Sequence, residues 1–171
     1  MTNLFADYRK NYLPFLLIFI LVFSRLIPHP PNFTPIIAAA IISTHLFKNI
    51  WSSSFILLAS MLLSDLFIGL HWGAIYVYIS LFIIIVFQSV IAKKISLKNL
   101  IFYCFVSSLI FFILANLGVW AFSNMYEKNI NGLFVCYILA IPFFTNTIIS
   151  TIFFSYLAYM VVNYGFKKKY S

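Results

Sequence analysis

Charged residues are scarce in this chain: they make up 8% of its 171 positions, and only three of them are acidic. A soluble domain carries about 25% charged residues, so this composition excludes a protein with a wettable surface. Cysteine occurs twice, at Cys104 and Cys136, without a CxxC pair, and we expect no disulfide framework. The sequence also lacks G-x-S-x-G, H-E-x-x-H and a phosphate-binding glycine loop. An enzyme is therefore not predicted.

Hydrophobic residues take the place of the missing charge, with 64% of the positions, including 21 phenylalanines and 11 tyrosines. The apolar stretches are longer and more continuous than the alternating strands of about ten residues in a membrane barrel. A spanning helix needs about 20 mostly apolar residues, because in hydrocarbon its backbone must satisfy its own hydrogen bonds. The sequence predicts an all-α membrane protein in a lipid bilayer, with one domain over residues 1–171.

Apolar segments predict a bundle of about six transmembrane helices. They cover residues 12–27, 34–48, 51–70, 72–92, 98–122 and 132–164. The segment 34–48 is short for a full span, so we expect it either to extend through Lys48 or to lie where neighbouring helices shield its ends. The segment 132–164 is long, and Pro142 inside it predicts a kink because proline removes one helical hydrogen bond.

Lysine and arginine are unequally divided between the two ends of these helices. With the N-terminus inside, nine of them lie on the cytoplasmic side and two, Arg25 and Lys128, on the far side. The positive-inside rule therefore predicts that both termini are cytoplasmic. The basic residues sit at helix ends and form no stripe with interleaved aromatic residues, so nucleic acid is not an expected partner.

Polar residues gather near the predicted outer face. Polar groups inside a membrane helix are costly and usually face the protein interior or a water-filled cavity. We therefore predict that these residues form a substrate-binding site. The candidates are Arg25, His29, Asn32, Asp65, His71, Asn116, Trp120, Tyr137 and Asn146.

Asp65 is the only acidic residue inside an apolar segment. An unpaired carboxylate there would take up a proton or bind a cation, so we expect a partner for it. The partner is either Arg25, at a similar depth on another helix, or His71, about a turn and a half away. Such a pair either fixes helix packing or contacts a substrate, and the sequence leaves both interpretations open.

For the other candidate residues, a structural role is also an alternative to substrate binding. Asn116 and Trp120 are four residues apart and share a helix face suited to a flat polar ligand. Tryptophan is also a common interfacial anchor, and asparagine also bonds between helices. Most hydroxyls around Asn146 are expected to bond to helix carbonyls or to neighbouring helices. The two histidines among the candidates have no fixed spacing, so neither a metal nor another cofactor is predicted.

Two stretches resemble a known family. Residues 25–36, RLIPHPPNFTPI, and residues 64–71, SDLFIGLH, resemble blocks of a family of small bacterial membrane proteins described as transport proteins of unknown function (DUF6580-like). Asn116 with Trp120, and the residues from Cys136 to Asn146, look like its later blocks. The resemblance implies a multi-pass protein of the bacterial inner membrane.

Proteins of this kind are similar in size, helix count and topology to the S components of energy-coupling-factor vitamin transporters. The analogy implies a ligand pocket open to the outside and covered by the outer loops. S components dock on an energising membrane partner through small residues of their first helix, but residues 12–27 contain no alanine or glycine. Small residues lie in segment 34–48 instead, where Ala39 and Ser43 are four apart. A stand-alone carrier is therefore the closer comparison.

Three functions are open from the sequence. The first is a small-molecule uptake protein that binds a vitamin or related nutrient in an outward-facing cavity. The second is a structural or assembly subunit of a membrane complex with no ligand of its own. The third, a membrane enzyme acting through Asp65 and His71, has the least support. A cavity among the polar candidates would favour the first function over the second.

Overall fold

The computed structural model describes residues 2–70, 73–91 and 95–167, with side chains for 12–70, 73–91 and 95–162. These residues form seven α-helices and no strand, which agrees with the predicted all-helical class. The helices are α1 Thr2–Leu26, α2 Ile36–Phe47, α3 Ile50–Ile68, α4 Ala74–Ile91, α5 Leu97–Phe122, α6 Ile130–Leu139 and α7 Ile141–Lys167.

The lengths of the helices distinguish two groups. In the described residues, four helices are long and apolar enough to cross a membrane: α3, α4, α5 and the part of α7 from Ile141 to Val162. Three apolar stretches are shorter, namely Tyr12–Leu26 in α1, α2 and α6. The structure therefore supports a helical membrane protein with four candidate spans in the described chain, while the count of six spans stays a prediction.

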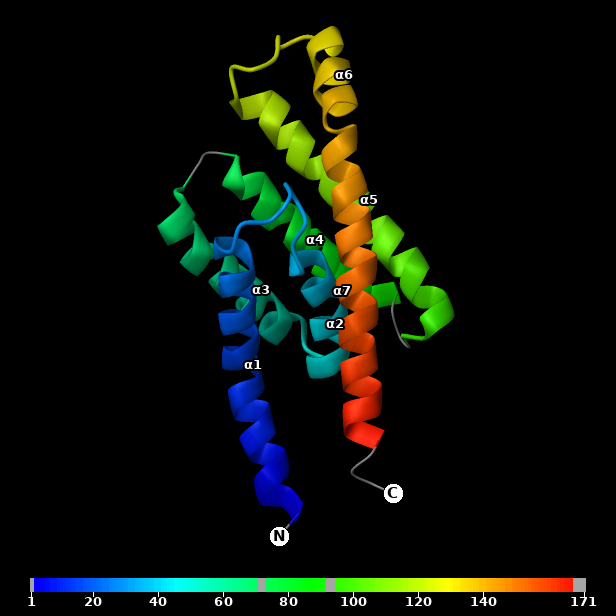
Figure 1. Cartoon of the computed structure of the whole chain (residues 1–171). Coiled ribbons are helices and arrows are strands. Elements are labelled where there is room, and N and C mark those ends of the chain that lie inside the picture. The colour runs from blue at the N-terminus through cyan, green and yellow to red at the C-terminus, as the bar shows by residue number, and fades with distance from the viewer. Residues whose placement is uncertain (1, 71–72, 92–94, 168–171) are drawn as a thin grey trace.

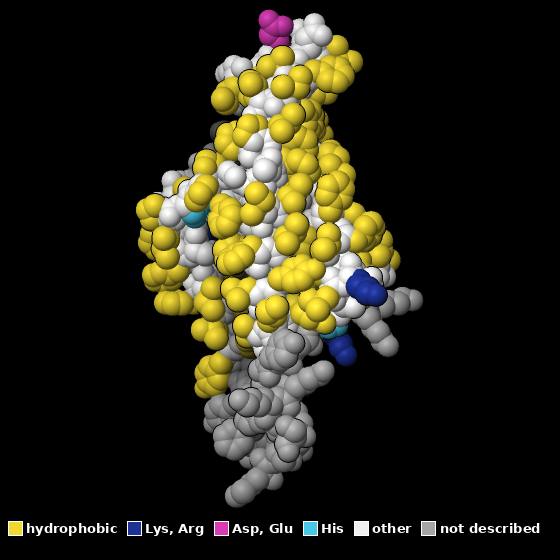
Figure 2. Space-filling view, turned by 45° about the vertical axis from the view of Figure 1, so that its right-hand side comes forward, with side chains coloured by type: hydrophobic (Ala, Val, Ile, Leu, Met, Phe, Trp, Pro, Cys, Tyr) yellow, Lys and Arg dark blue, Asp and Glu magenta, His cyan; other side chains and the backbone are white. Residues whose placement is uncertain are grey.

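The surface is apolar over most of the described chain. Large hydrophobic side chains stand out from the bundle, such as Phe67 at 75% and Trp51 at 74% exposure. Figure 2 shows hydrophobic side chains along most of one face, with basic side chains near its lower end and an acidic one at its upper tip. Such a surface favours a lipid environment, because soluble monomers rarely expose apolar patches of this extent.

The last predicted segment is divided into two helices. α6 ends at Leu139 and α7 begins at Ile141, one residue before the proline at position 142. Ala140 between them donates to the carbonyl oxygens of Cys136 and Tyr137, and Phe144 then resumes the ladder by donating to Ala140 at 3.0 Å. The predicted break near Pro142 is confirmed, and its cause is the missing backbone donor of proline.

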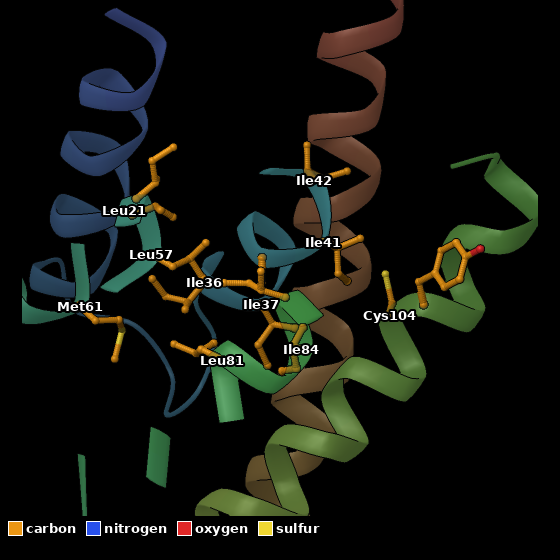
Figure 3. Close-up of a cluster of buried hydrophobic side chains, with 14 of the residues drawn as sticks. Leu21, Ile36, Ile37, Ile41, Ile42, Leu57, Met61, Leu81, Ile84 and Cys104 are labelled. Carbon is orange, nitrogen blue, oxygen red and sulfur yellow. The ribbon is translucent and has the colours of Figure 1, made fainter. Parts of the chain in front are cut away.

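The short helix α2 occupies the middle of the bundle. It packs against α3, α4, α5 and α7, and Ala40 and Ile41 are completely buried. Figure 3 shows its isoleucines between side chains of the neighbouring helices. The expectation that neighbours shield this short segment is confirmed. α2 ends at Phe47 and is capped by Lys48, whose φ of 50° places it in the left-handed region and turns the chain into α3.

The two terminal helices share one end of the molecule. α1 begins and α7 ends at the lower end in Figure 1, whereas α6 and its loop lie at the opposite end. Along its length α1 packs against α3, and α6 packs against α5 and α7. The start of α1 and the end of α7 therefore lie at the same end of the molecule, while the cytoplasmic location of both termini stays a prediction.

Candidate functional site: an ion pair between α1, α3 and α4

The site begins with a charged pair between two packed helices. Arg25 is the penultimate residue of α1, and Asp65 lies in the last turn of α3. Because the two helices pack along each other, Arg25 Nη1 lies 2.6 Å from Asp65 Oδ1. The side chain of Asp65 is 2% exposed and that of Arg25 is 16% exposed. The pair is therefore closed on the aspartate side and partly open on the arginine side.

Besides its ion pair with Asp65, Arg25 makes hydrogen bonds to other atoms of α3. Its Nη1 donates to the carbonyl oxygen of Met61 at 3.1 Å and to the hydroxyl of Ser64. The Ser64 hydroxyl in turn lies within hydrogen-bond distance of the carbonyl oxygens of Met61 and Ser60. These contacts settle the partner of Asp65 as Arg25 in the described chain. The alternative partner, His71, lies outside the described residues.

Tyrosine 78 of α4 completes the group, and the sequence analysis missed it. Its hydroxyl donates to Asp65 Oδ2, so each carboxylate oxygen of Asp65 has its own partner. We call Arg25, Asp65 and Tyr78 the charged network. No sequence signal separates Tyr78 from Tyr76, which packs against Phe122 with ring centroids 5.3 Å apart. Only the rotation of α4 decides which tyrosine faces the carboxylate.

A second group of the predicted residues joins the first loop to α7. The side-chain amide of Asn146 donates to the carbonyl oxygen of Pro31 at 3.0 Å, and Ser150 donates to the carbonyl oxygen of Asn32 at 3.3 Å. Asn32 has a φ of 61°, a conformation that asparagine tolerates better than most residues. His29 is exposed, with Nδ1 2.9 Å from the carbonyl oxygen of Pro30. This group holds the loop in place.

A third group lies where α5 meets α6. Asn116 donates its amide to the carbonyl oxygen of Phe112, on its own helix, at 2.7 Å. Trp120 Nε1 donates to the carbonyl oxygen of Glu127 at 2.9 Å, and Tyr137 donates to that of Ile113 at 2.7 Å. These side chains bond to the backbone of the α5–α6 hairpin, which we define as residues 112–139.

The predicted polar face is thus three separate groups. In the described part of the chain, no hydrogen bond or ion pair joins the charged network to the first loop or to the α5–α6 hairpin. Both cysteines are buried free thiols. Among the described residues, no three His, Cys, Asp or Glu side chains gather closely enough to hold a metal ion. The charged network is the only one of the three groups that contains ionisable side chains bonded to each other.

Comparison with known proteins assigns the chain to a family. No curated protein and no solved structure matches it. The likeness to S components therefore stays a prediction. The model of DUF6580, a family of unknown function, matches residues 6–171, and the chain belongs to this family.

Proposed function

We propose that this chain is an uptake protein for a small nutrient, a vitamin or a related molecule, and that the charged network binds the substrate or gates its entry. The observation that carries the proposal is the ion pair of Arg25 and Asp65, buried at one end of a bundle whose surface faces lipid. Ionisable residues inside a membrane protein are costly and rare, and they often mark substrate or ion pathways.

Energetics favours function over packing for this pair. Removing two charges from water costs several kcal/mol per ion, and their attraction repays that cost only with good geometry. Well-packed hydrophobic residues of similar volume are often as stable as a buried ion pair, or more stable. Stability alone is therefore a weak reason for the pair, whereas an interaction with a passing solute gives it a use.

The chemistry of the charged network suits exchange with a solute. The guanidinium of Arg25 binds carboxylates and phosphates through paired donors, and it is the more exposed partner. A solute that bonded to Arg25 would release Asp65, which is held from α4 by Tyr78. Because the network joins α1, α3 and α4, breaking the ion pair would loosen α1 from the rest of the bundle.

Uptake assays in vitamin auxotrophs test this proposal. Asp65→Asn keeps the size of the side chain and an acceptor for Tyr78 but removes the charge. We expect at least a tenfold loss of uptake for Asp65→Asn and Arg25→Gln at equal membrane expression. Glu127→Gln is the matched control, because Glu127 is an exposed carboxylate in the α5–α6 loop. If both network variants take up every nutrient tested at the wild-type rate, the assignment is wrong.

A structural or assembly subunit is the second candidate. The hydrogen bonds of Asn116, Trp120 and Tyr137 to backbone carbonyl oxygens support it, because these side chains serve the fold of the hairpin. Affinity purification of the tagged chain from its native membrane discriminates the two candidates. A stoichiometric partner complex without any nutrient uptake would favour the subunit, and uptake by the chain alone would favour the carrier.

The proposal assigns the chain to the inner membrane of a bacterium, with both termini in the cytoplasm. The excess of lysine and arginine on one side, nine against two, supports this orientation. Fusion of a fluorescent protein to the C-terminus tests it, because green fluorescent protein matures in the cytoplasm but not after Sec export. Fluorescent cells are expected, whereas activity of alkaline phosphatase fused at the same position would contradict the orientation.

A further inference from the structure

The ion pair of Arg25 and Asp65 is held by charge rather than by a hydrogen bond. Asp65 Oδ1 lies 2.6 Å from Arg25 Nη1, but it is a buried atom without a hydrogen-bond partner among the described residues. The reason is that Nη1 carries two hydrogens, and it donates to the carbonyl oxygen of Met61 and to the hydroxyl of Ser64. Asp65 Oδ1 therefore depends on the nearby positive charge and keeps an open lone pair inside the protein.

The guanidinium of Arg25 has more donors than α3 uses. Its contacts with the described residues all involve Nη1, whereas Nη2 and Nε carry three of its five N–H groups. The side chain is partly exposed, so the arginine is open to its surroundings over part of its surface. Nη2 and Nε together form a planar edge of the kind that binds a carboxylate through two parallel hydrogen bonds.

An anion on that edge changes what Asp65 requires. The negative charge of the anion offsets the charge of the guanidinium, and Asp65, whose side chain is 2% exposed, is then a buried carboxylate without a counterion. Such a group is costly, and protonation removes the cost because a neutral carboxyl group needs no counterion. Oδ1 accepts the proton on its open lone pair, while the hydroxyl of Tyr78 stays on Oδ2.

Few described titratable groups face Asp65 from the helices that pack against α3, which are α1, α2 and α4. From α1 it faces Arg25, and from α4 it faces Tyr78. His45 of α2 lies near Lys48, at the end of α2 that leads into α3. Asp65 lies in the last turn of α3, about 20 Å further along the helix axis. Within the described chain, the proton balance of Asp65 therefore depends on the charged network itself.

We propose that the charged network binds a monocarboxylate together with a proton, so that the protein is a proton-coupled carrier of carboxylate nutrients. The substrate class rests on the uptake function proposed above. The carboxylate binds Nη2 and Nε of Arg25, and a proton passes from water to Asp65 Oδ1 as the ion pair opens. The proton leaves again when the ion pair re-forms. The network is neutral before and after binding, whereas a dianionic phosphate would leave one charge uncompensated.

Infrared spectroscopy tests the proton site, because the chain has only three acidic residues. In a purified chain with Asp7→Asn and Glu127→Gln, Asp65 is the only carboxyl side chain, and a chain terminus is ionised at neutral pH. The C=O stretch of a protonated carboxyl group then reports on Asp65. We expect no such band at neutral pH and a clear band after Arg25→Gln, which Asp65→Asn should abolish. Lys128→Gln is the matched control without a band, because Lys128 is a cation bonded to hairpin carbonyl oxygens.

Proton uptake tests the coupling in the native sequence and does not depend on the folding of Arg25→Gln. The probes are nicotinate and pantothenate, with the uncharged nicotinamide and pantothenol as matched controls. Each is added to purified protein in a weakly buffered, sodium-free solution that contains a pH indicator. We expect nicotinate or pantothenate to draw one proton from solution for each molecule bound, and neither uncharged analogue to do so. Asp65→Asn should lose this effect, and Lys128→Gln should keep it.

Four results would overturn the proposal. They are a carboxyl band at neutral pH while Arg25 is present, no band in a folded Arg25→Gln chain, no proton uptake with either carboxylate, and proton uptake that requires sodium. All of them concern the purified protein. Failure of nutrient uptake in cells would therefore contradict the proposed function and leave these results unchanged. Nutrient uptake in cells without proton uptake by the purified protein would refute the proton coupling alone.

Discussion

In the charged network, polar side chains bond to one another across three helices, whereas in the α5–α6 hairpin they bond to nearby backbone. Arg25, Asp65 and Tyr78 each depend on a partner from a different helix. Trp120 and Tyr137 instead donate to carbonyl oxygens within their own hairpin. Removing Arg25 or Asp65 leaves the other charge unpaired in apolar surroundings. Removing a hairpin donor leaves only a backbone carbonyl oxygen with one hydrogen bond fewer. Residues of similar type at similar predicted depth therefore differ in the free energy of unfolding that is lost when they are replaced.

The largest effect should come from breaking the network on one side. Asp65→Leu leaves the Arg25 guanidinium without its carboxylate, and we expect the free energy of unfolding to fall by about 3–4 kcal/mol. Denaturation of the purified protein in mixed micelles measures it. Arg25→Met combined with Asp65→Leu should regain most of the loss, since a hydrophobic pair replaces the ionic one. A double variant as unstable as the single one would show that the ion pair is needed for packing.

The second effect tests the backbone of the hairpin. A Cβ atom at Gly132 would lie 2.1 Å from the carbonyl oxygen of Glu127, so Gly132→Ala must displace main chain. We expect a loss of about 2–3 kcal/mol in the same unfolding measurement. The neighbouring exposed Asn131→Ala is the control and should change stability by less than about 0.5 kcal/mol. Equal effects at the two positions would show that the loop yields easily.

A smaller effect is expected for a single hairpin hydrogen bond. Tyr137→Phe removes the hydroxyl that donates to Ile113 at 2.7 Å and keeps the ring, which packs against Phe112 with centroids 5.4 Å apart. The expected loss is about 1 kcal/mol. If Tyr137→Phe costs as much as Asp65→Leu, the contrast between the two regions is wrong.

The smallest effect belongs to Asn116, which the sequence analysis placed in the substrate site. Its amide bonds only to the carbonyl oxygen of Phe112, which already belongs to the ladder of the same helix. Asn116→Ala should therefore change the free energy of unfolding by less than about 0.5 kcal/mol, partly because alanine favours helix. Its uptake should equal that of the wild type. A clear loss of uptake without a loss of stability would return Asn116 to the substrate site.

The general architecture could be predicted because it depends on composition and length. Long apolar runs determine the helices, Pro142 predicts the break before α7, and the shortness of segment 34–48 predicts its shielded position. The division of the last segment could be predicted less well, because hydropathy alone does not show that the break before Pro142 leaves α6 as a separate short helix.

The candidate site was predicted less completely. The sequence gives the depth of a residue along a helix, but it does not give the direction in which the side chain points around the helix axis. Charge alone predicted that Asp65 needs a partner and left Arg25 and His71 open, and the structure shows the ion pair with Arg25. The role of Tyr78 and the separation of Asn116 from Asp65 depend on helix rotation and tilt. Most hydroxyls around Asn146 were expected to bond to helix carbonyls or neighbouring helices, and Thr145, Thr147 and Ser150 do bond to helix carbonyls.

The central position of α2 has a consequence for the order in which the protein is made. Twelve residues rise about 18 Å, less than the roughly 30 Å of a hydrocarbon core, so the insertion machinery meets a segment that cannot cross the membrane alone. Its neighbours α3, α4, α5 and α7 all emerge from the ribosome after it. All the helices that pack against α2 are therefore present only after α7 has been synthesised. A chain that stops earlier leaves α2 partly uncovered, and membrane quality control meets an incomplete core.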